Sequence, residues 1–93
     1  MSAPSLKAQF LGATRLAKAE ALIEWLDELK IEHVTNNNGI HIRIYREKDI
    51  INIWPTAEKL HVIEKGNKKY TPSKIILGNR YIADYIEEIA NEL

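Results

Sequence analysis

The chain has 93 residues and equal numbers of acidic and basic side chains, so its formal net charge is zero. This length predicts a single domain over residues 1–93, and a hydrophobic fraction of 45% is ordinary for a globular fold. The absence of cysteine excludes disulfides and thiolate metal sites. No apolar run approaches the roughly 20 residues of a membrane-spanning helix, so we expect a cytoplasmic protein without a membrane contact.

Charge is distributed unevenly along the chain. Residues 33–80 carry nine basic and four acidic side chains, a net charge of +5, whereas residues 81–93 carry four acids and no base. The acidic end offsets the long-range field of the basic middle. Charge alone therefore does not predict a nucleic-acid-binding protein.

The first part of the chain is predicted to be helical. Residues 1–14 form either a loose arm or a short helix that Ser5 caps and Gly12 interrupts. From about Arg15 to Lys30, apolar residues follow the helical period, with Trp25 near the edge of the stripe. The stripe consists of Leu16, Ala19, Leu22, Ile23, Leu26 and Leu29.

The middle of the chain has the alternating pattern of β-strands. Strands are expected at residues 40–46, 49–54 and 59–64, and a shorter one at 32–36 would reach them through an Asn38-Gly39 hairpin turn. The residues expected to point toward the helices are Ile40, Ile42, Ile44, Ile51, Ile53, Leu60 and Val62.

A last helix is predicted to begin at Thr71-Pro72, where threonine caps and proline occupies the first helical position. Gly78 would interrupt it and Asn79 would cap a second start. Its apolar stripe would be Ile75, Ile76, Leu77, Ile82, Ile86, Ile89 and Leu93. The predicted class is α+β: a helix, a three- to four-stranded antiparallel meander and a C-terminal helix, with the helices on one face of the sheet.

The opposite face of this sheet would be rich in aromatic and cationic side chains. Such groups stack on bases and pair with phosphates, and they also dominate protein interfaces. Alternatively, Trp54 folds over Pro55 to seal a sheet edge, while Arg43 and Tyr45 form an ordinary cross-strand pair. The candidate binding residues are His41, Arg43, Tyr45, Asn52, Trp54, Lys59 and His61, together with Lys68 and Lys69 of the following turn.

Little in the sequence predicts catalysis. No serine has a histidine and an acid in a recognisable arrangement, and no phosphate-binding loop is present. The spacing of His33, His41 and His61 matches no standard metal site, and Glu47 and Asp49 flank a turn where we expect solvent. We therefore expect no metal and no cofactor, and these residues favour a non-enzymatic protein over an enzyme.

Two resemblances follow from particular motifs. The stretch from Ala21 to Ile76 resembles a group of small uncharacterised phage and prophage proteins through Asn38-Gly39-Ile40-His41, Ile51–Thr56 and the basic segment Gly66–Lys74. The usual Thr-Gly-Lys-Trp continuation is replaced by Ala57–Leu60. This resemblance implies a phage origin but no mechanism.

Gly39-Ile40-His41 also resembles the strand histidine of HicA-type toxins, which share an α-β-β-β-α fold with double-stranded-RNA-binding domains. That resemblance implies RNA cleavage with His41 as the candidate general acid or base.

Two functions remain open. One is a phage-type, non-enzymatic accessory protein of the host cytoplasm that binds a host or phage protein through the open face of the sheet. The other is a nucleic-acid-binding module, with ribonuclease activity through His41, that uses Arg43, Trp54, Lys68 and Lys69. An exposed edge of the meander could also pair with a second copy and give a homodimer.

Overall fold

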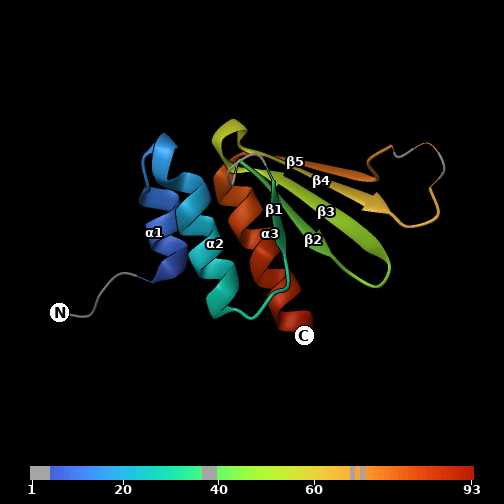
Figure 1. Ribbon diagram of the computed structural model, residues 1–93, viewed down its shortest axis with the longest axis horizontal. Coiled ribbons are helices and arrows are strands. Elements are labelled where there is room, and N and C mark those ends of the chain that lie inside the picture. The colour runs from blue at the N-terminus through green and yellow to red at the C-terminus, as the bar shows by residue number, and fades with distance from the viewer. Residues whose placement is uncertain (1–4, 37–39, 68, 70) are drawn as a thin grey trace.

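The computed structural model describes residues 5–36, 40–67, 69 and 71–93. It confirms the α+β class, with one strand more than predicted (Figure 1). The helices are α1 (Leu6–Gly12), α2 (Lys18–Glu28) and α3 (Asn79–Glu92), with short 3-10 helices at Arg15–Ala17 and Pro55–Ala57. The strands are β1 (Val34–Asn36), β2 (His41–Tyr45), β3 (Asp49–Trp54), β4 (Lys59–Glu64) and β5 (Lys74–Leu77).

The strands form one antiparallel meander in the order β1-β2-β3-β4-β5. The register pairs Ile42 with Ile53 and Ile51 with Val62, and these side chains are buried. The predicted alternation is therefore confirmed for the three central strands, because every second side chain of a strand points to the same face.

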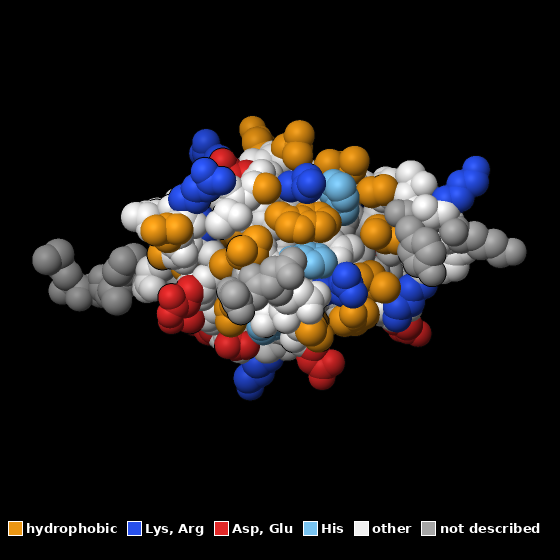
Figure 2. Space-filling view, turned by 45° about the horizontal axis from the view of Figure 1, so that its top comes forward, with side chains coloured by type: hydrophobic (Ala, Val, Ile, Leu, Met, Phe, Trp, Pro, Cys, Tyr) orange, Lys and Arg blue, Asp and Glu red, His pale blue; other side chains and the backbone are white. Residues whose placement is uncertain are grey.

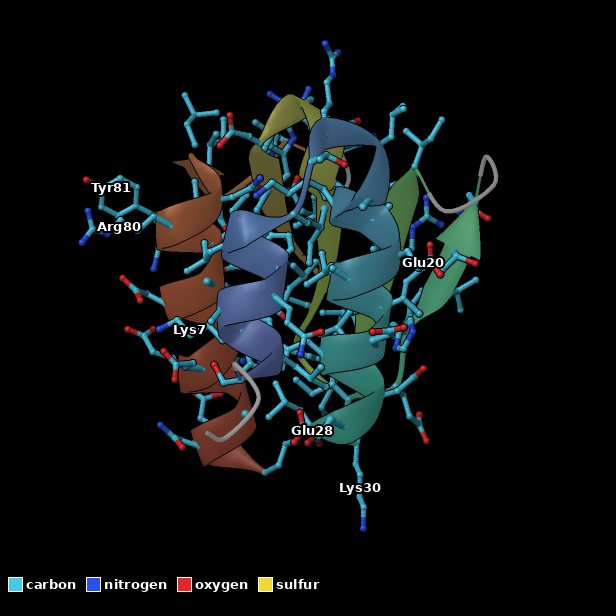
Figure 3. All side chains as sticks on the ribbon, turned by 90° about the vertical axis from the view of Figure 1, so that its left-hand side faces the viewer. Lys7, Glu20, Glu28, Lys30, Arg80 and Tyr81 are labelled. Carbon is cyan, nitrogen blue, oxygen red and sulfur yellow. The ribbon has the colours of Figure 1, made fainter. Side chains whose placement is uncertain are left out.

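The helices lie on one side of the sheet. Viewed from that side, α1 lies in front of α2 and α3, with the sheet behind them (Figure 3). Between helices and sheet, one apolar core joins Leu22 and Leu26 of α2 with Ile82 and Ile86 of α3 and the inward isoleucines of the strands. The opposite face of the sheet carries no described helix.

Residues 6–12 form a helix rather than a loose arm. The Ser5 hydroxyl accepts a hydrogen bond from the Ala8 N–H at 3.1 Å, as an N-cap should. At the other end of α1, the Lys18 ammonium donates to the carbonyl oxygens of Phe10 and Leu11 at 2.8 and 2.7 Å. Phe10 is fully buried against Trp25. Lys18 thus ties the C-terminal end of α1 to α2, and Phe10 anchors the helix in the core.

The structure corrects the predicted bounds of α2. The 3-10 helix precedes Lys18 and changes the phase of the spiral, so that Leu16 is 95% exposed rather than part of the apolar stripe. The helix ends at Glu28, and Lys30 adopts a left-handed φ of 60° beyond it. Trp25, which was placed near the edge of the stripe, is buried.

The prediction of a helix from Thr71-Pro72 is wrong. Residues 74–77 form β5, which pairs with β4 through Leu60↔Ile76 and His61↔Ile75. The chain then turns at Gly78, whose φ of 97° favours glycine, and α3 begins at Asn79. The Glu58 carboxylate accepts a hydrogen bond from the Asn79 N–H at 3.2 Å, so it partly caps this helix in place of the asparagine side chain.

Three further single-residue predictions are wrong. Ile40 lies in the turn before β2 and is half exposed, and Leu93 lies mostly in solvent beyond α3. Asp49 is buried, because it opens β3 beside Arg46. The Asn38-Gly39 turn lies outside the described residues, although β1 and β2 on either side of it do pair. Within the described part of the chain, no helix has the length and apolar character to span a membrane.

Candidate functional site

The face of the sheet opposite the helices gathers the predicted binding residues of the strands. We call this surface the open sheet face. Figure 2 shows pale blue histidine surface on both sides of an apolar patch, while red acidic side chains lie away from the centre of the view. By strand register, its described members are Val34, Asn36, His41, Arg43, Tyr45, Ile50, Asn52, Trp54, Lys59, His61, Ile63, Ile75 and Leu77.

Trp54 lies at the centre of a cross-strand sandwich. Its indole stacks on the imidazole of His41, with ring centroids 4.7 Å apart and planes within 2°. The Lys59 ammonium lies 4.7 Å from the indole centroid. Because β2 and β4 flank β3, His41 and Lys59 approach the indole from opposite sides. Both π-faces of Trp54 are therefore covered by the protein itself, and the predicted alternative in which Trp54 only seals an edge is not what the structure shows.

Asn52 of β3 connects His41 and Arg43, which both lie on β2. Its Oδ1 accepts a hydrogen bond from Arg43 Nε at 3.1 Å and lies 2.9 Å from His41 Nε2. Because arginine can only donate, this atom acts as an acceptor, and His41 must carry its proton on Nε2. His41 and Asn52 are buried, with His41 9% exposed. Arg43 also donates to the Tyr45 hydroxyl at 3.2 Å, but both residues lie on β2, so this contact is within one strand and the predicted cross-strand pair is wrong.

His61 completes the cluster on β4. Its ring meets the Trp54 indole edge-on, with centroids 5.2 Å apart. Burial lowers the pKa of His61 below its ordinary value of 6.5, and the nearby Lys59 ammonium lowers it further. Near neutral pH this histidine is therefore uncharged, and its contribution to the face is a flat, mostly apolar ring.

Replacing Lys59 by glutamine is expected to raise the pKa of His61 toward 6.5, because the charge goes and the burial stays. The lowered pKa also affects stability, because the folded protein binds a proton at His61 less readily than the unfolded chain does. The resulting contribution to stability is fully present above pH 6.5 and is lost as the pH falls through the folded-state pKa of His61. An NMR titration of the His61 ring protons measures the shift. Lys69→Gln, in the β4–β5 connection, is the control; an unchanged His61 pKa in Lys59→Gln would contradict the assignment.

Exposed apolar side chains extend the open sheet face to both edges of the sheet. Those on the edge strands were not among the binding residues predicted from the sequence. Val34 on β1 and Ile75 and Leu77 on β5 are about half exposed or more, as is Tyr45. The sequence did not place Ile75 and Leu77 on this face because it predicts a helix, and not a strand, over residues 74–77. Of the two predicted lysines, Lys69 lies in the β4–β5 connection, and Lys68 is outside the described residues.

The permanent charges of the open sheet face are all positive. Arg43 and Lys59 are its permanent cations, and none of its described members listed above is an acid. Elsewhere, the described residues include no group of three or more His, Cys, Asp or Glu side chains arranged to hold a metal ion. Chemically, the face offers aromatic and aliphatic contact area with two fixed positive charges.

Comparisons with protein-family models, with the curated proteins and with solved structures found no match to this chain. The functional argument therefore depends on the geometry of the open sheet face.

Proposed function

We propose that the protein is a non-enzymatic accessory protein of the phage type, acting in the host cytoplasm, that binds a host or phage protein through the open sheet face. The observation that carries this proposal is the composition of the face. Exposed apolar side chains at both edges surround a centre of Trp54, Arg43 and Tyr45, and tryptophan, tyrosine and arginine supply most of the binding energy in protein interfaces.

The charges indicate the chemistry of the partner. Arg43 and Lys59 have no acidic neighbour among the described members of the face, so an acidic group of a partner would meet two unopposed cations. The surrounding surface is aliphatic and aromatic. The partner that fits is a protein surface with apolar side chains around one or two carboxylates, since complementary charge gives specificity and faster association.

A nucleic-acid partner fits the same face less well. Stacking of bases needs a free aromatic face, and both faces of the Trp54 indole are already covered by His41 and Lys59. A ribonuclease role for His41 needs an accessible imidazole, whereas this one packs on Trp54 and bonds Asn52. These contacts favour the protein partner over the nucleic-acid alternative.

Replacing Trp54 by alanine is expected to weaken partner binding by about 30-fold, which corresponds to the ~2 kcal/mol of an interface hot spot. The partner is first identified by affinity capture from a lysate of phage-infected bacteria, with the wild-type protein and Trp54→Ala as parallel baits. The purified pair is then measured by isothermal titration calorimetry.

Leu16→Ala is the matched control, because Leu16 is 95% exposed in the 3-10 helix before α2 and is not a member of the open sheet face. It should bind like the wild type. Equal affinity of Trp54→Ala and wild type would reject the open sheet face as the interface. Titration with mixed RNA and DNA oligonucleotides at low salt tests the alternative: binding that falls steeply with salt and is lost in Trp54→Ala would replace the protein-binding proposal.

A further inference from the structure

The outer edge of β5 is open. Among the residues that the structure describes, β5 is the last strand of the sheet and pairs with β4 alone. The Gly78 N–H donates to the Glu58 carbonyl at 2.9 Å, and alternate residues of an antiparallel ladder bond to the same neighbour. Ile76 and Lys74 therefore direct their backbone groups to β4. Ile75 and Leu77 direct their N–H and C=O groups outward, away from the sheet.

The side chains at this edge are also exposed. Ile75 is 56% and Leu77 64% exposed on the open sheet face, and Tyr81 in the first turn of α3 is 64% exposed nearby. Natural edge strands are usually shielded by charges, proline, bulges or short length. Within Lys74–Leu77 the only charge, Lys74, points to the helix side, where its ammonium lies 4.9 Å from the Tyr85 ring. The outer edge of β5 thus combines unpaired backbone N–H and C=O groups with exposed apolar side chains.

The opposite edge of the sheet is shorter and more polar, although Val34 on it is 48% exposed. β1 has three residues, Val34–Asn36, of which two are polar. A short polar edge offers little to a pairing strand.

We propose that β5 pairs antiparallel with β5 of a second copy of this chain, about a two-fold axis that sets Ile75 of each copy opposite Leu77 of the other. In this register the outward N–H and C=O groups of both residues in both copies find partners. The side chains of Ile75 and Leu77 then form apolar cross-strand pairs on the open sheet face. This inference is independent of the proposed function.

The charges favour a second copy as the occupant. In the proposed register, Lys74 lies opposite Gly78 of the second copy. The Gly78 N–H of that copy donates to the carbonyl of Glu58, just before β4. The two Lys74 residues are four positions apart along the paired strands, roughly 13 Å. The two Lys74 ammonium groups, which are the only charges within β5, are therefore kept apart. The contact is also isologous and uses the β5 edge of both copies, so it closes at a dimer instead of growing into a fibre.

The test is the oligomeric state of the purified protein by sedimentation velocity, without any partner. The wild type is expected to sediment as a dimer at high micromolar concentration. Leu77→Pro is expected to sediment as a monomer with half that mass. Proline removes the outward N–H and leaves the ladder to β4 intact, because prolines are tolerated on edge strands where the N–H faces solvent.

Ile75→Lys is the second variant, in case Leu77→Pro does not fold. It keeps every backbone group and places a charge opposite Leu77 of the second copy, so it should also be monomeric with an unchanged circular dichroism spectrum. Val34→Lys, on the β1 edge, is the matched control and should remain a dimer. A monomeric wild type, a dimer that survives both β5 variants, or a dimer lost in Val34→Lys would each overturn the proposal.

Discussion

Phe10→Ala is expected to lower the free energy of unfolding by about 3–5 kcal/mol, the usual cost of removing a buried phenylalanine. Phe10 is fully buried in the common core, and its ring lies 6.2 Å from that of Trp25 and 5.4 Å from the Lys18 ammonium. A domain of this size has a total stability on the order of 5–14 kcal/mol. The single substitution therefore removes a large part of it.

Urea denaturation followed by tryptophan fluorescence measures this loss, since Trp25 reports directly on the packing of α1. Leu16→Ala is the control: with Leu16 almost fully in solvent, its effect should stay within about 0.5 kcal/mol. A loss below about 1 kcal/mol for Phe10→Ala would mean that α1 contributes nothing to the core, as a loose arm would.

Much of the fold could be predicted because apolar residues recur at every second position on the inward side of the three central strands. Ile42, Ile44, Ile51, Ile53, Leu60 and Val62 follow this period, although Ile50 and Ile63 also place apolar side chains on the open sheet face. Helix α3 was equally plain from Ile82, Ile86 and Ile89, which recur at helical spacing.

The segment Lys74–Leu77 could not be assigned in this way. Three consecutive apolar residues fit a short strand and a helical turn equally well, and Thr71-Pro72 upstream gives a local helix-start signal. Pairing with β4, which depends on residues more than ten positions earlier, decided the outcome. Propensity is a weak signal when a neighbouring strand offers a hydrogen-bonding edge.

The candidate site was predicted in composition but not in arrangement. Alternation places His41, Trp54 and Lys59 on one face, and the register makes them neighbours. Side-chain rotation then decides whether the indole lies open as a stacking platform or stands between its neighbours. Rotamers depend on packing that no sequence pattern reports. The covered indole is therefore a finding of the structure, and it is what favours a protein partner over a nucleic acid.

The burial of Asp49 was also beyond the sequence, because it depends on an ion-pair network that joins the β2–β3 turn to the end of α3. Its carboxylate lies 3.1 Å from Arg46 Nε across the β2–β3 turn, and Arg46 reaches Glu92 at the end of α3 at 3.4 Å. The Asp49 side chain is only 6% exposed and that of Arg46 16% exposed, whereas that of Glu92 is 61% exposed. The chain thus encloses one ion pair between the hairpin and the last helix turn.

Arg46→Met is expected to destabilise the protein by about 3–5 kcal/mol, because it leaves the Asp49 carboxylate buried without its cation. Thermal and urea denaturation measure the loss. Glu92→Gln removes the exposed half of the network and should cost less than about 1 kcal/mol. The double substitution Arg46→Met with Asp49→Leu should recover most of the stability, since replacing both buried charges by apolar side chains is often neutral. A double variant no more stable than Arg46→Met would show that the cost comes from lost packing of the arginine stem instead of an unpaired charge.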